Sequence, residues 1–104
     1  MISVAMAAYK GEKYIKPQLE SVLSQLCSSD EVIVSDDDST DSLKTYLSAN
    51  FDDSRIKYIR GPGAGVVKNF ENAIMHCSGD IIFLCDQDDV WLPDKVSAVT
   101  KALD

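Results

Sequence analysis

Residues 81–91 read Ile-Ile-Phe-Leu-Cys-Asp-Gln-Asp-Asp-Val-Trp, and this segment decides the fold that the sequence predicts. Its first five residues are apolar, as is typical of a strand buried on both faces in a parallel sheet. Asp86, Asp88 and Asp89 follow at the carboxyl end of that strand, where open α/β sheets bind ligands. Because close carboxylates repel one another, one interpretation is a divalent cation that carries a phosphate ester. The alternative is that Asp89 caps a helix beginning near Pro93 and the other two face water.

The rest of the chain alternates short β-rich segments with helical periodicity. We expect strands at Ile2–Ala8, Glu31–Ser35, Ile56–Ile59 and from Ile81, and helices from about Lys16 to Leu26, from a cap at Ser39 or Thr40 through Leu47, at Val66–Cys77, and from Pro93 to the end. Inward-facing positions are Tyr14, Ile15, Leu19, Val22, Leu23 and Leu26 in the first helix and Val67, Phe70, Ala73, Ile74 and Cys77 in the third. This βα alternation predicts an α/β fold with parallel strands and right-handed crossovers.

Composition limits the class of protein. The 104 residues suffice for a single domain over 1–104, and the net charge of −7 argues against a nucleic-acid or anionic-membrane surface. An acidic chain still binds an anionic nucleotide where a metal bridges the two. Cys27, Cys77 and Cys85 lack a C-x-x-C pair and are interpreted as buried free thiols. No apolar run reaches the length of a membrane span and no basic signal-peptide segment is present, so we expect a cytoplasmic protein.

A second acidic cluster, Asp36-Asp37-Asp38, ends the second predicted strand. If both acidic strands are parallel and central, the two clusters face one crevice. One carboxylate set then accepts hydrogen bonds from a base or ribose, and the other holds a metal on the pyrophosphate. The glycine-containing stretch from Gly61 to Lys68 lacks the P-loop spacing, so we interpret it as a turn before a helix.

Several short motifs follow one another in a fixed order. They are Ala8-Tyr9-Lys10, Asp36-Asp37-Asp38-Ser39-Thr40-Asp41, Lys68-Asn69, Ser78-Gly79-Asp80 and Asp86-Gln87-Asp88-Asp89-Val90-Trp91. In this order, over essentially the whole chain, they resemble the N-terminal half of a family 2 glycosyltransferase with the GT-A fold. The last motif is similar to the Asp-x-Asp motif of transferases that build bacterial polysaccharides, rhamnosyltransferases among them. The resemblance implies a Rossmann-like nucleotide-binding half whose parallel sheet has the strand order 3-2-1-4.

The resemblance also implies roles for single residues. Tyr9 would stack on the nucleobase beside the backbone of Ala8, Asp37 would accept the base N–H, and Asp36 would support it. Asp86 would hydrogen-bond the ribose, Lys68 would approach the base or the phosphate, and Asp88 would ligate Mg²⁺ or Mn²⁺ on the diphosphate. The implied donor is a UDP- or dTDP-sugar, and the implied acceptor is a saccharide or lipid-linked saccharide.

The sequence departs from the family pattern at three places. Ala7-Ala8 replaces the usual Pro-Thr, Lys10 stands for Asn, and Asp38 stands for a Gly whose position often needs positive φ. The catalytic base, usually an Asp, is expected beyond Asp104 in a longer protein, so the fragment by itself is expected to bind donor without transferring it. A homodimer and association with the inner membrane's cytoplasmic face are further expectations.

Two other classes of function are consistent with the residues. A receiver-type or phosphoryl-transfer α/β domain also gathers carboxylates around Mg²⁺, but it needs an acid at the end of the first strand, where this chain has Ala7-Ala8-Tyr9. A non-catalytic binding or interaction module of the same fold is the other alternative. His76, the only histidine, is interpreted as a helix-end residue rather than a base, and Trp91 either touches a donor sugar or packs behind the acidic segment.

Overall fold

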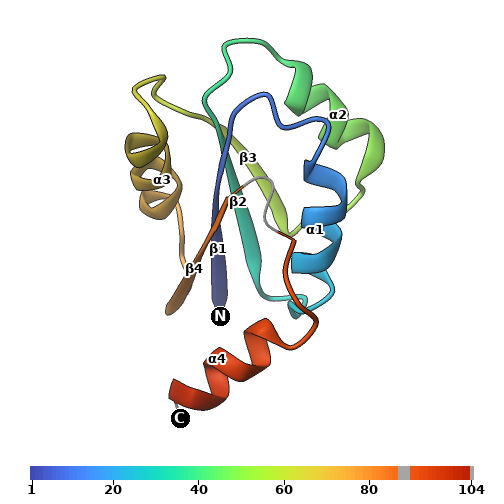
Figure 1. Ribbon diagram of the computed structural model, residues 1–104, viewed down its shortest axis with the longest axis vertical. Helices are drawn as coiled ribbons and strands as arrows, with labels where there is room; N and C mark the ends of the chain where they lie inside the picture. Colours follow the sequence, from blue (N-terminus) through green and yellow to red (C-terminus); the bar gives the residue numbers. More distant parts are fainter. Residues whose placement is uncertain (87–89, 104) are drawn as a thin grey trace.

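The computed structural model describes residues 1–86 and 90–103, in which a four-stranded parallel sheet carries helices on both faces (Figure 1). The elements are β1 Ile2–Ala8, α1 Ile15–Leu23, β2 Glu31–Asp36, α2 Ser42–Asn50, β3 Ile56–Arg60, α3 Val66–Met75, β4 Ile81–Asp86 and α4 Lys95–Leu103. The strand order is β3-β2-β1-β4, and each neighbouring pair is parallel. The predicted α/β class and strand order 3-2-1-4 are confirmed.

The central strand β1 separates two cores of unequal size. Val4, Met6 and Ala8 face the larger core, which α1 and α2 cover, whereas Ala5 faces the smaller core under α3. The larger core consists of Val4, Met6, Ala8, Ile15, Leu19, Val22, Leu23, Val32, Val34, Leu43, Leu47, Phe83, Cys85, Trp91 and Val96. Figure 1 shows α1 and α2 together on one side of the sheet and α3 on the other. This alternation buries β1 on both faces and fixes the position of its carboxyl end.

The buried face of α3 differs from the predicted one. Asn69 and Ala73 are 2% and 0% exposed, whereas Val67 and Ile74, which were predicted to face inward, are 67% and 37% exposed. Ala73 lets the helix pack closely on Ala5 and Ile33, and Asn69 forms hydrogen bonds to the strands beneath it. Polar bonding and close approach therefore orient this helix, in place of the larger apolar stripe that periodicity favoured.

The prediction that β4 is buried on both faces is wrong. Phe83 and Cys85 are buried, but Ile82 and Leu84, on the opposite face, are 40% and 54% exposed. The cause is the position of α3, which packs on β1 and β2. Among the described residues, no element covers the outer face of β4 in the way that α1 covers its inner face.

The helix ends depart from expectation in small ways. α1 begins at Ile15, one residue before the predicted start at about Lys16, and Pro17 lies in its first turn, but Tyr14 is exposed rather than buried. The N-cap residue of α2 is Asp41, not Ser39 or Thr40, although the Thr40 hydroxyl does accept the Ser42 N–H at 3.4 Å. Proline and side-chain oxygens thus mark where these helices begin to within a residue or two.

The three cysteines are free thiols, as predicted, but not all are buried. Cys85 is buried, Cys77 is half-buried and Cys27 is exposed. Cys27 lies in the turn between α1 and β2, where its N–H donates to the Asp30 carboxylate at 2.7 Å. Across the described ranges, no helix has the length and apolarity needed to cross a lipid bilayer.

Candidate functional site

A cavity of about 570 Å³ lies at the carboxyl end of β1. It is lined by Ala7, Ala8, Tyr9, Asp37, Gly63, Gly65, Val66, Asn69 and Asp86. Ala7 pairs with Asp86 of β4 and Ala8 pairs with Asp36 of β2, so the ends of three strands meet here. The volume lies within the range of about 300–1,000 Å³ for small-molecule sites, and the position is the switch point at which open α/β sheets bind ligands.

Asp37 projects from the residue after β2 into this cavity. Its backbone N–H donates to the carbonyl of Ala8 at 2.9 Å and so continues the pairing with β1. Its Oδ1 accepts the N–H of Gly63 at 2.9 Å, which joins the β3–α3 loop to the carboxylate. Within the described part of the chain, Asp37 Oδ2 accepts no hydrogen bond, and Asp37 lines the cavity. One carboxylate oxygen of Asp37 therefore holds the β3–α3 loop, and the other is available to a ligand.

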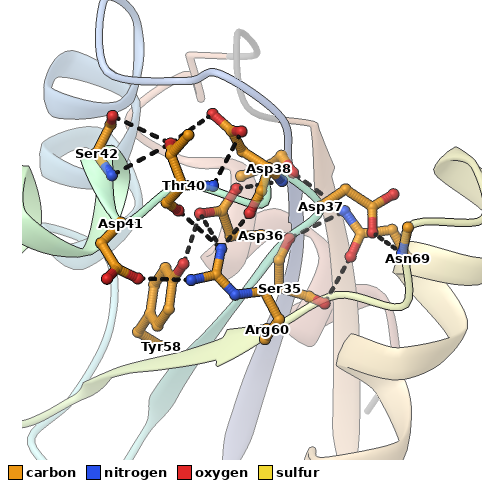
Figure 2. Close-up of polar contacts among 12 residues, drawn as sticks. Ser35, Asp36, Asp37, Asp38, Thr40, Asp41, Ser42, Tyr58, Arg60 and Asn69 are labelled. Carbon is orange, nitrogen blue, oxygen red and sulfur yellow. Dashed lines mark hydrogen bonds and ion pairs between the residues drawn. The ribbon is translucent and has the colours of Figure 1, made fainter.

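Asn69 is a site residue that the sequence analysis quoted only as part of a motif. Its Nδ2 donates to the carbonyls of Ala8 and Ser35 at 3.2 and 3.0 Å, and its Oδ1 accepts from the Ser35 hydroxyl at 2.6 Å (Figure 2). This buried amide fastens the first turn of α3 to both β1 and β2. Its spacing of four residues from Ala73 was the signal that both lie on one buried face.

Asp36 lies beside the cavity without lining it. Its carboxylate is fully buried on the α2 side of the sheet, accepts the Tyr58 hydroxyl at 2.6 Å and the Asp38 N–H at 3.0 Å, and lies 3.7 Å from Arg60 (Figure 2). Burial raises the pKa of Asp36, although the hydroxyl, the N–H and the guanidinium oppose that rise. Burial also raises the pKa of Tyr58, with the Asp36 carboxylate as the second cause. Asp36 thus fixes the backbone that leads to Asp37.

Arg60, the last residue of β3, braces the loop that follows β2. Its guanidinium donates to the carbonyls of Asp38 and Thr40 and to the carboxylate of Asp41 (Figure 2). Asp38 is not among the residues with positive φ; it is 8% exposed, and its carboxylate accepts the backbone N–H and the hydroxyl of Thr40. The negative charge of this loop is therefore held by one arginine and by local hydrogen bonds, and the turn does not need glycine at position 38.

The remaining predicted base-binding residues lie at different distances from the cavity. Tyr9 lines it and is 54% exposed, with the Lys10 ammonium 5.3 Å from its ring centroid. Lys10 adopts a left-handed φ of 53°, a conformation that Asn adopts more readily than most residues. Lys68 does not line the cavity; it is exposed on α3, 3.4 Å from Glu71. The structure thus brings together Ala8, Tyr9, Asp37 and Asp86 and leaves Lys68 outside.

The predicted metal ligand, Asp88, lies outside the described residues. Asp86, at the end of β4, lines the cavity with an exposed carboxylate. Among residues 1–86 and 90–103, no group of three His, Cys, Asp or Glu side chains is arranged to hold a metal. The donor that is described, a carboxylate oxygen at the cavity wall, has the chemistry that Mg²⁺ and Mn²⁺ prefer.

Two other side chains that the sequence singled out have structural positions. His76 is the residue that caps the C-terminus of α3, and its Nδ1 lies 2.8 Å from the carbonyl of Asn72, as a helix-end residue would. Trp91 is 4% exposed and packs against Phe83 with ring centroids 5.5 Å apart. Its ring therefore belongs to the larger core.

Comparison with known proteins identifies the family. The model for "Glycosyl transferase family 2" matches residues 3–104. The chain belongs to glycosyl transferase family 2. This family 2 chain is similar to the Escherichia coli protein UDP-Glc:alpha-D-GlcNAc-diphosphoundecaprenol beta-1,3-glucosyltransferase WfgD, at 34% identity over 92% of this chain and 38% of that protein. It is also similar to the putative colanic acid biosynthesis glycosyl transferase WcaA, at 36% identity over 93% of this chain and 36% of WcaA.

Solved structures agree with the family assignment. A crystal structure of Staphylococcus aureus TarS 1-349 superimposes with a TM-score of 0.85 at 25% identity, over 99% of this chain and 32% of that one. A second, described as TarS 1-349 in complex with UDP-GlcNAc, superimposes with a TM-score of 0.81 at 25% identity, over 99% of this chain and 31% of that one. The predicted GT-A, Rossmann-like fold is confirmed. The family 2 chain spans about a third of the length of these relatives.

Proposed function

We propose that this chain is the donor-binding part of a glycosyltransferase of bacterial cell-surface polysaccharide synthesis, and that its cavity binds the nucleotide of a UDP- or dTDP-sugar. The observation that carries the proposal is the cavity at the end of β1, with Asp37 on the β2 side and Asp86 on the β4 side. WfgD and the TarS complex are both described with a uridine diphosphate sugar, which supports UDP as the first candidate.

In this proposal, opposite walls of the cavity contact different parts of the nucleotide. Asp37 Oδ2 accepts the base N–H, with Asp36 behind it and Tyr9 stacked on the ring beside the backbone of Ala8. Asp86, on the opposite side of β1, accepts a hydrogen bond from the ribose. Both carboxylates would be electrostatically unfavourable near a diphosphate, so the phosphates need a positive partner of their own.

We propose that this positive partner is Mg²⁺ or Mn²⁺ held by Asp88. The Lys68 ammonium on α3 would be a second positive charge if the ligand extends toward it. A divalent ion acts as a Lewis acid on the nucleoside diphosphate as it leaves. The residues of this chain bind and orient the nucleotide. We expect the base for the acceptor hydroxyl and the site that binds the acceptor in the rest of the longer protein. For that protein we propose inverting transfer of a hexose or rhamnose to a saccharide or lipid-linked acceptor at the cytoplasmic face of the membrane, as the name of WfgD suggests for the acceptor.

The receiver-type alternative has no support at the cavity. Its chemistry needs an acid at the end of the first strand, and here that end is Ala7 and Ala8, which pair with Asp86 and Asp36 without a carboxylate of their own. A non-catalytic nucleotide-binding module would use the same cavity. Binding and transfer are therefore tested separately, the first on this chain and the second on the longer protein.

The first experiment is calorimetric titration of UDP and dTDP into the folded chain, with and without Mn²⁺. We expect metal-dependent binding that Asp37→Asn and Asp86→Asn weaken and that Asp88→Ala reduces to the level seen without metal. Asp80→Asn is the matched control because Asp80 lies just before β4, at the other end of the strand from Asp86, and its side chain is 91% exposed. Its substitution should leave both affinities unchanged.

The outcomes separate the parts of the proposal. Metal-independent binding with full affinity in Asp88→Ala would show that the metal assignment is wrong while the cavity is right. Preference for dTDP over UDP would redirect the donor class toward deoxysugars. No binding of either nucleotide by a folded chain that circular dichroism shows to be native would contradict the proposed donor site in this chain.

A further inference from the structure

One face of α1 and the turn after it carries polar side chains that bond to β4 and to the segment 90–96. Gln18, Ser21 and Gln25 are spaced three and four residues apart and therefore lie on the same side of the helical path. All three bond to residues about 67–71 positions later in the chain. In Figure 1 the segment that leads into α4, from residue 90 on, passes close to the C-terminal part of α1.

The contacts lie on both sides of residues 87–89 in the sequence. Before them, Gln18 Nε2 donates to the Cys85 sulfur at 2.9 Å. After them, Ser21 Oγ accepts the Trp91 N–H at 3.0 Å, and Gln25 both donates to the Leu92 carbonyl at 2.6 Å and accepts the Val96 N–H at 2.8 Å. One short stretch of helix and turn thus fixes the chain on each side of the acidic motif.

We propose that Gln18, Ser21 and Gln25, called here the α1 clamp, are positioning residues for the metal-dependent part of the donor site. This inference rests on the proposed function. None of the three lines the cavity. Their effect passes through Cys85, which directly precedes Asp86, and through Trp91, which packs on Phe83 in the core. By fixing these neighbours they hold the end of β4, and with it Asp86, next to β1, and they hold the chain where it resumes at residue 90.

The polar character of the clamp supports a positioning role over a purely structural one. Gln18 is fully buried, and its Oε1 has no hydrogen-bond partner among the described residues, so its amide is a cost to folding that an apolar side chain would avoid. Two of the Gln25 contacts are to backbone groups of the segment 90–96, which specify the path of the chain rather than its sequence. A site held to within fractions of an ångström needs such supports.

The test compares clamp variants with a control that removes other hydrogen bonds to the end of the same helix. Ser21→Ala and Gln25→Leu remove the contacts to Trp91, Leu92 and Val96. Arg55→Ala is the matched control, because the Arg55 guanidinium donates to the carbonyls of Leu23 and Leu26 at 3.1 and 3.0 Å and forms no hydrogen bond to the described residues 90–96. Melting temperatures are measured first, so that UDP affinity is compared between variants that have lost similar stability.

Two measurements are made on each variant. Trp91 is the only tryptophan, so its emission maximum and its quenching by acrylamide report the anchoring of this segment without any ligand. We expect a red shift and stronger quenching in Ser21→Ala and Gln25→Leu and neither in Arg55→Ala. In calorimetry, we expect the clamp variants to bind UDP about tenfold more weakly with Mn²⁺ present, the scale found for residues that orient metal ligands, and unchanged without Mn²⁺.

Each result decides something. Wild-type affinity in both clamp variants, or an equal loss in Arg55→Ala, would overturn the positioning role. Unchanged fluorescence in the clamp variants would overturn the anchoring itself. If the wild-type chain binds no UDP, the proposed function fails and the clamp's effect on affinity fails with it, whereas the fluorescence result still decides whether the clamp anchors Trp91.

Discussion

The side-chain oxygens Oδ1 of Asp37 and Asn69 both face Gly61, so closely that a Cβ on Gly61 would lie 2.5 Å from Asn69 and nearer still to Asp37. The N–H of Gly61 also donates to the carbonyl of Asp36 at 2.7 Å, which holds the chain in place between them. Glycine is required here for close approach. The cavity wall thus depends on a residue that has no functional group.

Gly61→Ala should therefore damage the site more than the fold. Its Cβ displaces the side chains of Asp37 and Asn69, and we expect UDP to bind at least about tenfold more weakly, a loss of about 1.4 kcal/mol. The free energy of unfolding should fall by about 1–3 kcal/mol from overpacking. Ala64→Ser, at an exposed position in the same loop, is the control and should change neither quantity. Wild-type affinity in a folded Gly61→Ala protein would show that the two side chains yield without cost to binding.

Asn69 offers a second prediction, about stability. Asn69→Leu removes two donors to strand carbonyls and one acceptor of the Ser35 hydroxyl, all at a buried position. We expect the free energy of unfolding in urea to fall by about 1–3 kcal/mol, the cost of leaving buried polar groups without partners.

Lys68→Ala is the neighbouring control for Asn69→Leu. The Lys68 ammonium is exposed and is paired only loosely with Glu71, so its loss should change stability by less than about 0.5 kcal/mol. The same variant also tests the implied contact of Lys68 with the nucleotide, since a large loss of UDP affinity without a change in stability would place that side chain at the ligand. Equal destabilisation by both substitutions would contradict the anchoring role of Asn69.

The sequence was sufficient to predict the order of strands and helices along the chain and that Asp37 and Asp86 meet at the strand ends, where the structure has a cavity. Strong local signals carried these predictions: the apolar run 81–85, the glycine-containing turn from Gly61, and the β-rich segments that alternate with helical periodicity. The parallel orientation of the strands follows from βα alternation with right-handed crossovers, whereas the strand order 3-2-1-4 was implied by the family resemblance. The acidic residues Asp37 and Asp86 then share a cavity because β1 lies between β2 and β4.

What the sequence could not supply was the choice between competing faces. Helical periodicity in α3 favoured the larger apolar residues Val67 and Ile74, but the sheet accepts Ala73 for close packing and Asn69 for hydrogen bonds. Asp36 and Asp37 are adjacent and chemically identical, and only the family resemblance distinguished them; in the structure one carboxylate points into the protein and the other lines the cavity. Such choices depend on tertiary contacts that periodicity does not encode.

Glu31 lies at the end of the sheet opposite the cavity, and its contacts predict that stability depends on pH. Burial by itself would raise the pKa of Glu31, but hydrogen bonds from Lys57, Ser3 and the Ser78 N–H, together with the Lys57 charge, lower that pKa below its ordinary value of 4.5. Because the unfolded chain then binds more protons between the two pKa values, the stabilisation from Glu31 is fully present above about pH 4.5 and is lost as the pH falls through the folded pKa.

Glu31→Gln measures this contribution. We expect the variant to be less stable than the wild type at pH 7, and the difference between their melting temperatures to shrink as the pH is lowered below 4.5. Glu20→Gln, at an exposed position on α1, should track the wild type across the whole range. A difference between Glu31→Gln and the wild type that stays constant from pH 7 to pH 3 would mean that the lost contact is one of packing, with no proton linkage.

The last prediction concerns the two faces of β4 and compares two adjacent residues, one on each face. Phe83 is 8% exposed and packs on Trp91, so Phe83→Ala should cost about 3–5 kcal/mol of unfolding free energy. Leu84 points the other way and is 54% exposed, so Leu84→Ala should cost less than about 1 kcal/mol, well below the 2–5 kcal/mol of a buried leucine. Urea titrations of both variants at several protein concentrations check this. Large losses from both would mean that the outer face of β4 is covered in solution, and a loss from Leu84→Ala that grows with concentration would identify the covering as a second copy of the chain.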